Sequence, residues 1–164
     1  MESPSDIQPK DSPKKDDIIY NTTMKYPKAV FDTNVVVAAM RSRRGASNRL
    51  LELFAKGRIR VSISVPLILE YESVLRRQAR ELGLTVKDVT DFIDFFCKVG
   101  EKQEIHFMWR PALRDPDDDM VLELGVAAGA DIVTFNTKDF GAAGRYGVRV
   151  YEPGTYLRKV EGVK

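Results

Sequence analysis

The pattern of hydrophobic and polar positions alternates along the chain between short β-rich runs and stretches with helical spacing. The short runs predict strands at residues 29–32, 60–64, 104–107, 131–135 and 148–151. Apolar residues three or four positions apart predict helices at residues 47–56, 66–82, 86–98 and 117–128, the first two ended by Gly57 and Gly83. This alternation predicts an α/β fold of the three-layer α/β/α type, in which helices cover both faces of a mostly parallel sheet of about five strands.

The two ends of the chain lack this pattern. Residues 1–27 are rich in Ser, Pro, Asp and Lys, a composition that buries too little apolar surface to offset the entropy lost on ordering. We therefore expect a disordered N-terminal tail at residues 1–27, one domain at residues 28–157 and a short C-terminal tail at residues 158–164.

Composition and charge narrow the classes of protein to which the chain can belong. Its 164 residues, 43% of them hydrophobic and 30% charged, fit one globular domain. Because Cys97 is the only cysteine and His106 the only histidine, an internal disulfide and a zinc site of the Cys/His type are both excluded. The charged start and the lack of a long apolar run predict a cytoplasmic protein without a membrane span. A net charge of +2 permits a nucleic-acid partner without requiring one.

An acidic residue follows the first predicted strand. Asp32 ends the run AVFD and precedes TNVVVAA, so we expect its carboxylate at the carboxyl end of a buried strand, where open α/β sheets bind their ligands. A charge between two apolar segments requires a partner or a function. The alternative role for such a residue is to cap the next helix, although Thr33 or Asn34 could fill that position.

A second acid lies at the start of the last predicted helix. Asp118 shares a helix face with Val121 and Leu122, so it is expected to point along the side that faces the core. The pair Asp115-Pro116 already provides a cap and a first-turn proline, which leaves Asp118 free for another role. The acids on either side are interpreted as first-turn charges that favour the helix dipole: Asp117 and Asp119.

Three further polar residues are weaker candidates on spacing alone. Glu70 borders the apolar face of its predicted helix, and by spacing it could equally be a plain surface residue. Asn136 and Asp139 lie just beyond the predicted strand that contains Thr134, again at the carboxyl end of a strand. Turn formation in a loop is an equally good explanation for these two.

Several segments together resemble the PIN domain family, and more closely its branch of VapC-type toxins of toxin–antitoxin systems. The matching stretches are VFDTNVVVAAM, RGASNRLLELFAKGRIRVSIS, VPLILEYESVLRR, RDPDDDMVLELGVAAGADIVTFNTKDF and VRVYEP, which cover most of residues 28–153. Each motif alone is weak, so the resemblance depends on their order and spacing together.

The resemblance implies a metal site. By position, Asp32, Glu70 and Asp118 correspond to the three catalytic, metal-binding acids of the family. A fourth metal-binding position falls at Asn136, where many members carry Asp, and Asp139 is near enough in sequence to compensate. The polar residues beside these acids are expected to support them: Thr33, Asn34 and Thr134.

The family also implies the chemistry: an endoribonuclease that uses Mg²⁺, or Mn²⁺ in its place, to hydrolyse RNA. Mg²⁺ prefers oxygen ligands and keeps several waters, and it activates water while offsetting charge on the phosphate. Phe107 and Trp109 could stack on a base, with core or interface packing as the alternative. Basic residues near the presumed cleft are candidates for binding the RNA backbone: Arg41, Arg43, Arg44, Arg49 and Arg77.

Partners and rival functions follow from the same resemblance. It implies an antitoxin protein and a homodimer, with part of the apolar helix at residues 92–97 available for assembly. The runner-up is a PIN-fold RNA-binding or scaffold protein with weak or no nuclease activity, which Asn136 keeps open. A phosphatase of the haloacid dehalogenase type also begins with a strand-end aspartate, but it requires a second Asp where this chain has Asn34.

Overall fold

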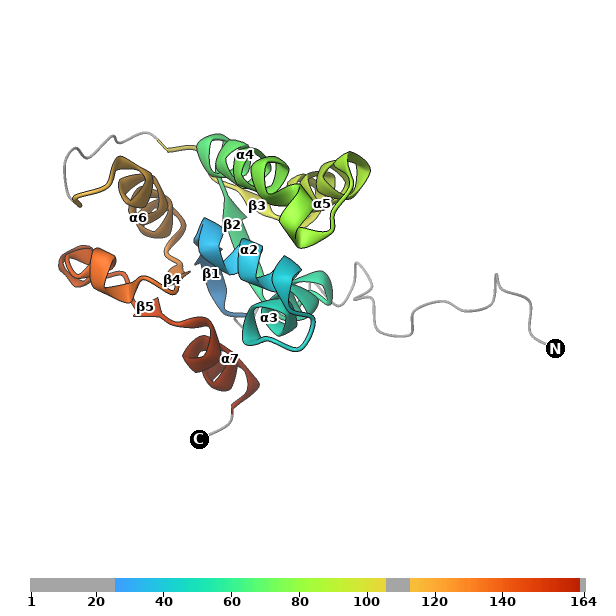
Figure 1. Ribbon diagram of the computed structural model, residues 1–164. Coiled ribbons are helices and arrows are strands. Elements are labelled where there is room, and N and C mark those ends of the chain that lie inside the picture. Colours follow the sequence, from blue (N-terminus) through green and yellow to red (C-terminus); the bar gives the residue numbers. More distant parts are fainter. Residues whose placement is uncertain (1–25, 106–112, 163–164) are drawn as a thin grey trace.

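Five parallel strands form the centre of the fold, with helices around them (Figure 1). This computed structural model describes residues 26–105 and 113–162. The strands are β1 (Lys28–Phe31), β2 (Arg60–Ile63), β3 (Glu101–Lys102), β4 (Asp131–Val133) and β5 (Val150–Tyr151). The helices are α2 (Thr33–Arg41), α3 (Ala46–Ala55), α4 (Val65–Leu82), α5 (Val86–Val99), α6 (Pro116–Ala128) and α7 (Pro153–Glu161), with 3₁₀ helices η3 (Thr137–Phe140) and η4 (Ala143–Tyr146). Within these described ranges, no helix combines the length and the apolarity that crossing a membrane requires.

The strands are ordered β3-β2-β1-β4-β5 in the sheet. Ala29 of β1 lies opposite Val61 of β2 on one side and opposite Asp131 of β4 on the other. Because crossovers between parallel strands are right-handed, the connections leading from β1 to β3 and the connection returning to β4 cover opposite faces. Helix α6 accordingly lies across the sheet from α2 and α3 (Figure 1). The predicted three-layer α/β/α fold with a parallel sheet of about five strands is confirmed.

The central strand is apolar because helices cover both of its faces. Ala29, Val30 and Phe31 of β1 are all 0% exposed. On one side of the sheet, Phe96 of α5 packs against Phe54 of α3 and Tyr71 of α4, with ring centroids 5.1 Å and 5.4 Å apart. The apolar helix predicted at 92–97 is therefore mainly part of the core, as its aromatic spacing indicates.

The third strand differs from its predicted position. The β-prone residues at 104–107 predict a strand there, whereas β3 is Glu101–Lys102 and pairs in parallel with β2. Gly100 is the C-cap of α5, so the chain reaches the sheet edge immediately after the helix and pairing begins at the next residue. Some of the predicted residues lie outside the described ranges: His106, Phe107 and also Trp109.

The C-terminal boundary also differs from the expected one. The pattern predicts a tail at 158–164, but α7 continues to Glu161 and packs against α3. Tyr156 of α7 is fully buried, and Arg49 of α3 forms an ion pair with Glu161 at 3.1 Å. The predicted boundary of the domain therefore falls inside a helix. The expected N-terminal tail at 1–27 lies almost entirely outside the described residues.

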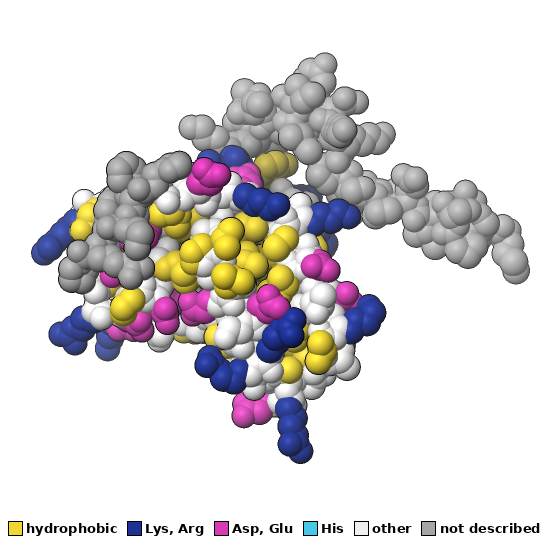
Figure 2. Space-filling view, turned by 90° about the horizontal axis from the view of Figure 1, so that it is seen from above, with side chains coloured by type: hydrophobic (Ala, Val, Ile, Leu, Met, Phe, Trp, Pro, Cys, Tyr) yellow, Lys and Arg dark blue, Asp and Glu magenta, His cyan; other side chains and the backbone are white. Residues whose placement is uncertain are grey.

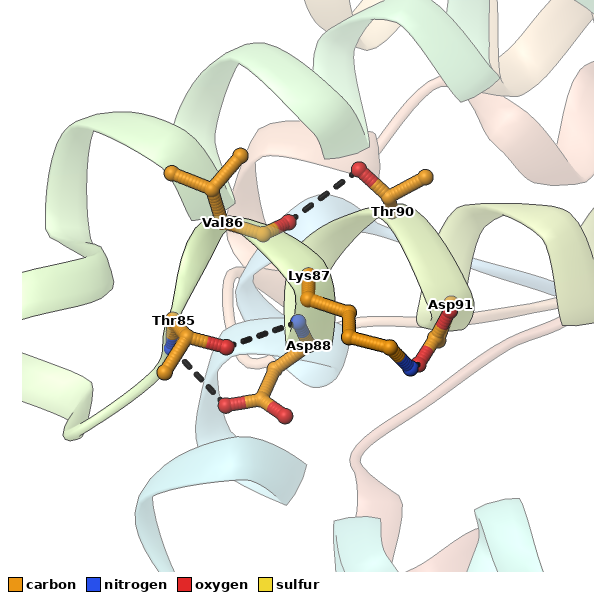
Figure 3. Close-up of polar contacts among 6 residues, drawn as sticks. All are labelled: Thr85, Val86, Lys87, Asp88, Thr90 and Asp91. Carbon is orange, nitrogen blue, oxygen red and sulfur yellow. Dashed lines mark hydrogen bonds and ion pairs between the residues drawn. The ribbon is translucent and has the colours of Figure 1, made fainter.

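Helix α5 begins with a capping box (Figure 3). The Thr85 hydroxyl accepts a hydrogen bond from the Asp88 N–H at 3.0 Å, and the Asp88 carboxylate accepts one from the Thr85 N–H at 2.8 Å. These bonds satisfy two N–H groups that have no partner inside the helix. One turn further on, the Thr90 hydroxyl donates to the Val86 carbonyl at 3.1 Å, a bond that caps nothing.

Replacing the capping threonine tests this local structure. Thr85→Ala is expected to lower the free energy of unfolding by about 1 kcal/mol, because the Asp88 N–H loses its acceptor. Thr90→Ala is the matched control, and its effect should stay within about 0.5 kcal/mol because an exposed mid-helix position favours alanine. Urea unfolding followed by circular dichroism measures both. Equal losses in the two variants would contradict the capping role.

Candidate functional site

The candidate site lies where the strand order reverses. Strand β1 has β2 on one side and β4 on the other: the chain moves outward from β1 to β2 and β3 and then returns from β3 to β4 on the opposite side of β1. Open α/β sheets bind ligands beyond the carboxyl ends of the strands at such a switch point, here the ends of β1 and β4. Asp32 follows β1, Thr134 follows β4, and the Asp32 N–H donates to the Val133 carbonyl at 2.9 Å. The strand-end residues picked out in the sequence thus meet at this edge of the sheet.

Asp32 is only 8% exposed, and three hydrogen-bond donors hold its carboxylate. Its Oδ1 accepts from the Thr33 N–H at 2.8 Å, while its Oδ2 accepts from the Thr134 hydroxyl at 2.7 Å and from the Asn34 amide at 3.4 Å. Asp32 is itself the N-cap of α2, so the capping role left open in the sequence belongs to Asp32 and not to Thr33 or Asn34. The cause is that α2 begins directly after the strand, with no linker between them. Capping fixes one oxygen and leaves the direction of the carboxylate well defined.

Glu70 reaches the site because α4 packs over the end of β1. The fully buried Tyr71 donates its hydroxyl to the Phe31 carbonyl, which fixes this turn of α4 against the last residue of the strand. The neighbouring Glu70 is half-buried, and its Oε1 accepts from the Thr33 hydroxyl at 3.0 Å. Thr33 therefore links two of the predicted acids, with its N–H bonded to Asp32 and its hydroxyl to Glu70.

Asp118 comes from the first turn of α6. Asp115 caps this helix, its side chain accepting from the Asp117 N–H at 2.9 Å, and Pro116 follows in the first turn, as predicted. Asp118 is half-buried. Burial first, and then repulsion from Asp32 and Asp115, raise the pKa of Asp118 from 3.8 to about 7. Asp32 contributes the largest of these repulsions, so Asp118 lies near enough to Asp32 for that charge to raise its pKa.

The three carboxyl groups share an environment that disfavours their charged forms. Burial is the largest cause of the raised pKa of Asp32, and hydrogen bonds from Thr134 and Thr33 oppose it. Burial also raises the pKa of Glu70, against the hydrogen bond from Thr33. The neighbouring charges that act most strongly on all three groups are carboxylates. A cation placed among them would gain Coulomb energy and relieve the repulsion.

The two residues beyond β4 contribute differently to this environment. Asn136 is exposed at the start of η3, and its N–H donates to the Thr134 hydroxyl at 3.0 Å. Asp139 is also exposed, and its negative charge raises the pKa of both Asp32 and Asp118. Asp139 is thus the η3 side chain that adds negative charge to the acidic cluster, which consists of Asp32, Glu70 and Asp118.

Two neighbours of Asp118 have roles that the sequence pattern did not indicate. The Asp115 charge raises the pKa of Asp32, Glu70 and Asp118, although the sequence indicated only a cap. Asp119 lies in the first turn of α6, as interpreted, but it is also 2% exposed and accepts from the Leu113 N–H at 2.8 Å, a contact that the sequence did not indicate. The available signal was the density of acids in DPDDD, which exceeds what one helix start requires.

The predicted backbone-binding arginines occupy unlike positions. Arg41 is exposed at the end of α2 and lines a cleft beside the acids. Arg49 is already paired with Glu52 at 2.9 Å and Glu161 at 3.1 Å, so it joins α3 to α7 rather than offering a free charge. The other three are exposed at the α2–α3 turn or on α4: Arg43, Arg44 and Arg77.

The donor atoms of the cluster fit a hard divalent cation. Among the residues that the structure describes, no group of three or more Asp, Glu, His or Cys side chains lies close enough to hold a metal ion unaided. Mg²⁺ commonly takes one or two carboxylates and completes its shell with water, so such a group is not required. The donors available at this edge of the sheet are oxygens of carboxylates, hydroxyls and amides, which suit Mg²⁺ and Mn²⁺.

Comparison with known proteins agrees with this architecture. The PIN domain family matches residues 28–138, and the chain belongs to the PIN domain family, as its motifs indicate. No curated protein matches the sequence.

Two solved structures show the same fold. The first is a chain from the crystal structure of VapBC2 from Rickettsia felis bound to a DNA fragment of the VapBC2 promoter. It has a TM-score of 0.51 and 17% sequence identity, and the match covers 76% of this chain and 98% of that chain. A chain of VapBC-1 from nontypeable Haemophilus influenzae has a TM-score of 0.52 at 12% identity, covering 77% and 98%. At such low identity these likenesses establish the fold alone.

Proposed function

We propose that this PIN-domain protein is a metal-dependent endoribonuclease that hydrolyses RNA phosphodiester bonds. One observation supports the proposal above all others. Asp32, Glu70 and Asp118 lie at the switch point of the sheet, and the charges that act most strongly on them are negative. A site that recruits a divalent cation in this way can also bind a phosphodiester, because the cation attracts the phosphate that the acids alone would repel.

Each residue of the proposed site has a separate task. Asp32, Glu70 and Asp118 would hold Mg²⁺ or Mn²⁺, which when bound supplies water activation and offsets charge on the phosphate. The Thr134 hydroxyl orients Asp32, and the Thr33 hydroxyl orients Glu70. Carboxylates fixed in this way need little reorganisation as charge develops during the reaction.

The number of ions depends on the residues beyond β4. An amide at Asn136 carries no charge, so it attracts a second cation less than the carboxylate found there in many family members. Asp139 supplies a charge nearby and could bind through water. We therefore propose one tightly bound ion, and a second whose binding depends on Asp139.

An antitoxin is the proposed protein partner, in keeping with the fold shared with VapBC chains. Val65 and Leu69 lie one turn apart on α4, next to Glu70, and are 74% and 59% exposed. Figure 2 shows hydrophobic side chains gathered over the α4 face, with acidic side chains along one border. A segment covering this face would reach the acids and block the site. A homodimer and a cytoplasmic location are further proposals from the sequence.

Cleavage of labelled RNA tests the proposed function. Single-stranded RNA is incubated with purified protein in Mg²⁺, in Mn²⁺ or in EDTA, with DNA of the same sequence alongside. Cleavage of RNA in either metal and none in EDTA is the expected result. Cleavage that persists in EDTA would contradict metal dependence. Binding without cleavage across several RNAs would favour the RNA-binding alternative, which Asn136 makes plausible.

Two arginines provide a matched test of backbone binding. Arg41→Ala is expected to weaken RNA binding about 3- to 10-fold and to reduce the dependence of log affinity on log salt by about 0.7, because one phosphate contact is lost. Arg49→Ala should leave both quantities nearly unchanged, since Arg49 is paired with Glu52 and Glu161. Fluorescence anisotropy at several salt concentrations measures both. Equal losses of affinity in the two variants would contradict this assignment.

A further inference from the structure

A cleft opens beside the acids, between α2 and α4. Its volume is about 560 Å³, which falls within the range of about 300–1,000 Å³ that is typical of small-molecule sites. Its lining combines apolar Val37 and Val74 with polar Arg41 and Gln78, and it includes the ring of Phe135. This mixture suits an aromatic ligand that also carries polar groups.

Phe135 is an exposed aromatic residue whose backbone is fixed. It is 48% exposed, although it directly follows the fully buried Thr134. The Phe135 N–H donates to Asn34 Oδ1 at 3.3 Å, and the next N–H, of Asn136, donates to the Thr134 hydroxyl at 3.0 Å. These bonds fix the backbone on both sides of the side chain, and the Phe135 side chain lines the cleft. A ring held in this position gains free energy when a ligand covers it.

Two polar side chains of the cleft are not engaged elsewhere in the described part of the chain. The half-buried Gln78 side chain makes no hydrogen bond there, and Arg41 makes no ion pair there. Asn34 differs, because its amide already bonds to Asp32, to Thr134 and to the Phe135 N–H. Gln78 therefore offers a free donor and acceptor, and Arg41 offers a free positive charge.

Two residues that line the cleft are hydrogen-bonded to the acids. Thr33 lines the cleft and bonds to both Asp32 and Glu70, and Asn34 lines the cleft and bonds to Asp32. A nucleic-acid strand with a phosphate at the acids would therefore bring an adjoining nucleoside to the cleft. We propose that the cleft binds one base of the RNA, stacked on Phe135, next to the phosphate that is cleaved. This inference rests on the proposed function and adds to it a base-binding subsite.

A nucleobase matches each feature of the cleft. Sequence-specific proteins that bind single-stranded RNA stack unpaired bases on aromatic rings and hydrogen-bond to their edges. The Phe135 ring provides the stacking surface, and the Gln78 amide can bond to the base edge. Arg41 can bind the adjoining phosphate. Phe135 is therefore the stacking surface, which accepts any base, and Gln78 is the specificity-determining residue, so cleavage should depend on base identity at one position of the RNA.

An abasic scan tests the inference. Binding is measured in the Asp118→Asn protein, which is expected to cleave RNA about 100- to 1,000-fold more slowly than the native protein, with single-stranded RNAs that each lack one base. Removal of one particular base, beside the phosphate cut by the native protein, should weaken binding about 10-fold. The further change Phe135→Leu keeps an apolar side chain without a ring. It should weaken binding of intact RNA about 10-fold and abolish the effect of removing that base.

Control variants and the RNA cleavage assay separate the possible outcomes. Phe135→Tyr keeps the ring, and Val86→Ala removes exposed apolar surface on α5, so both should retain the full dependence on the base. If base removal costs the same with and without the Phe135 ring, the inference fails even where the native protein cleaves RNA. An apolar segment of a protein partner then becomes the better occupant. A third outcome separates the two proposals. If base removal weakens binding only when the Phe135 ring is present, but the native protein does not cleave RNA, the base site is supported and the nuclease proposal is overturned.

Discussion

Asp118→Asn is expected to reduce RNA cleavage in Mg²⁺ about 100- to 1,000-fold, because one of the charges that would hold the metal is removed while the size of the side chain is kept. The matched control is Asp94→Asn, which removes one exposed carboxylate from α5. That variant should cleave RNA as fast as the native protein. Initial rates with labelled RNA at saturating Mg²⁺ measure both. Unimpaired cleavage by Asp118→Asn would move the active site to other residues.

The same substitution should stabilise the metal-free protein at neutral and alkaline pH. The folded-state pKa of Asp118, about 7, lies above its ordinary value of 3.8, so the folded protein holds a proton that the unfolded chain has released. The cost of ionising Asp118 therefore grows as the pH rises from about 4 to about 7 and is fully present above that range. At pH 8 in EDTA, Asp118→Asn should unfold with a free energy about 1–2 kcal/mol higher than the native protein, allowing for solvent screening at this half-buried position.

Below pH 4 this stability difference should disappear, since Asp118 is then protonated in both the folded and the unfolded states. Urea unfolding at several pH values in EDTA measures it. A constant difference between the two proteins from pH 4 to pH 8 would show that repulsion among the carboxylates is not its cause.

Thr134→Val is expected to reduce both Mg²⁺ affinity and RNA cleavage about 10- to 100-fold. The hydroxyl of Thr134 donates to Asp32 Oδ2 at 2.7 Å and accepts from the Asn136 N–H at 3.0 Å. Valine has the same shape and can do neither, so the Asp32 carboxylate loses the bond that orients it. The buried Asp32 Oδ2 then keeps only the longer hydrogen bond from the Asn34 amide, at 3.4 Å, and stability should fall by about 1–3 kcal/mol.

Thr134→Ser is the control for this prediction, since it restores the hydroxyl and should recover most of the cleavage and of the Mg²⁺ affinity. Calorimetric titration measures the Mg²⁺ affinity of each folded variant. It thereby distinguishes loss of orientation of the Asp32 carboxylate from general destabilisation of the protein. If Thr134→Val binds Mg²⁺ as tightly as the native protein, the hydroxyl has only a structural role.

Most helices and strands could be predicted because their signals are local. The helix predicted at 86–98 is found at Val86–Val99, since its apolar spacing and its capping threonine lie within a few residues of each other. Helix α7 was missed because Pro153 and Gly154 at its start are typical of a loop. The burial of Tyr156 against α3 stabilises α7, and that contact joins distant parts of the sequence.

The acids of the candidate site could be proposed from the sequence, but the hydrogen bonds that join them to other helices and strands could not. A strand-end position selected Asp32, a helix face turned toward the core selected Asp118, and the family motifs agreed with both choices. The Thr33 hydroxyl bonds to Glu70 from another helix, and the Thr134 hydroxyl bonds to Asp32 from another strand. Such bonds depend on how the helices and strands pack together, which no local pattern in the sequence records.

The arginines show the same limit. A run of basic residues predicts free charges near the cleft, and the exposed Arg41 fits that expectation. Arg49 does not, because Glu161 lies at the far end of the chain and its ion pair with Arg49 forms only when α7 packs on α3. Which charges of such a run are already paired is decided by tertiary structure.

Location of bound Mn²⁺ by anomalous diffraction tests the metal site most directly. Crystals of the protein grown with Mn²⁺ are expected to show an anomalous peak bounded by the carboxylates of Asp32 and Asp118, with Glu70 or water completing the shell. The peak should be absent from crystals of Asp118→Asn grown in the same way. A peak at another place in the native protein, or none beside Asp32 at saturating Mn²⁺, would contradict the proposed metal site.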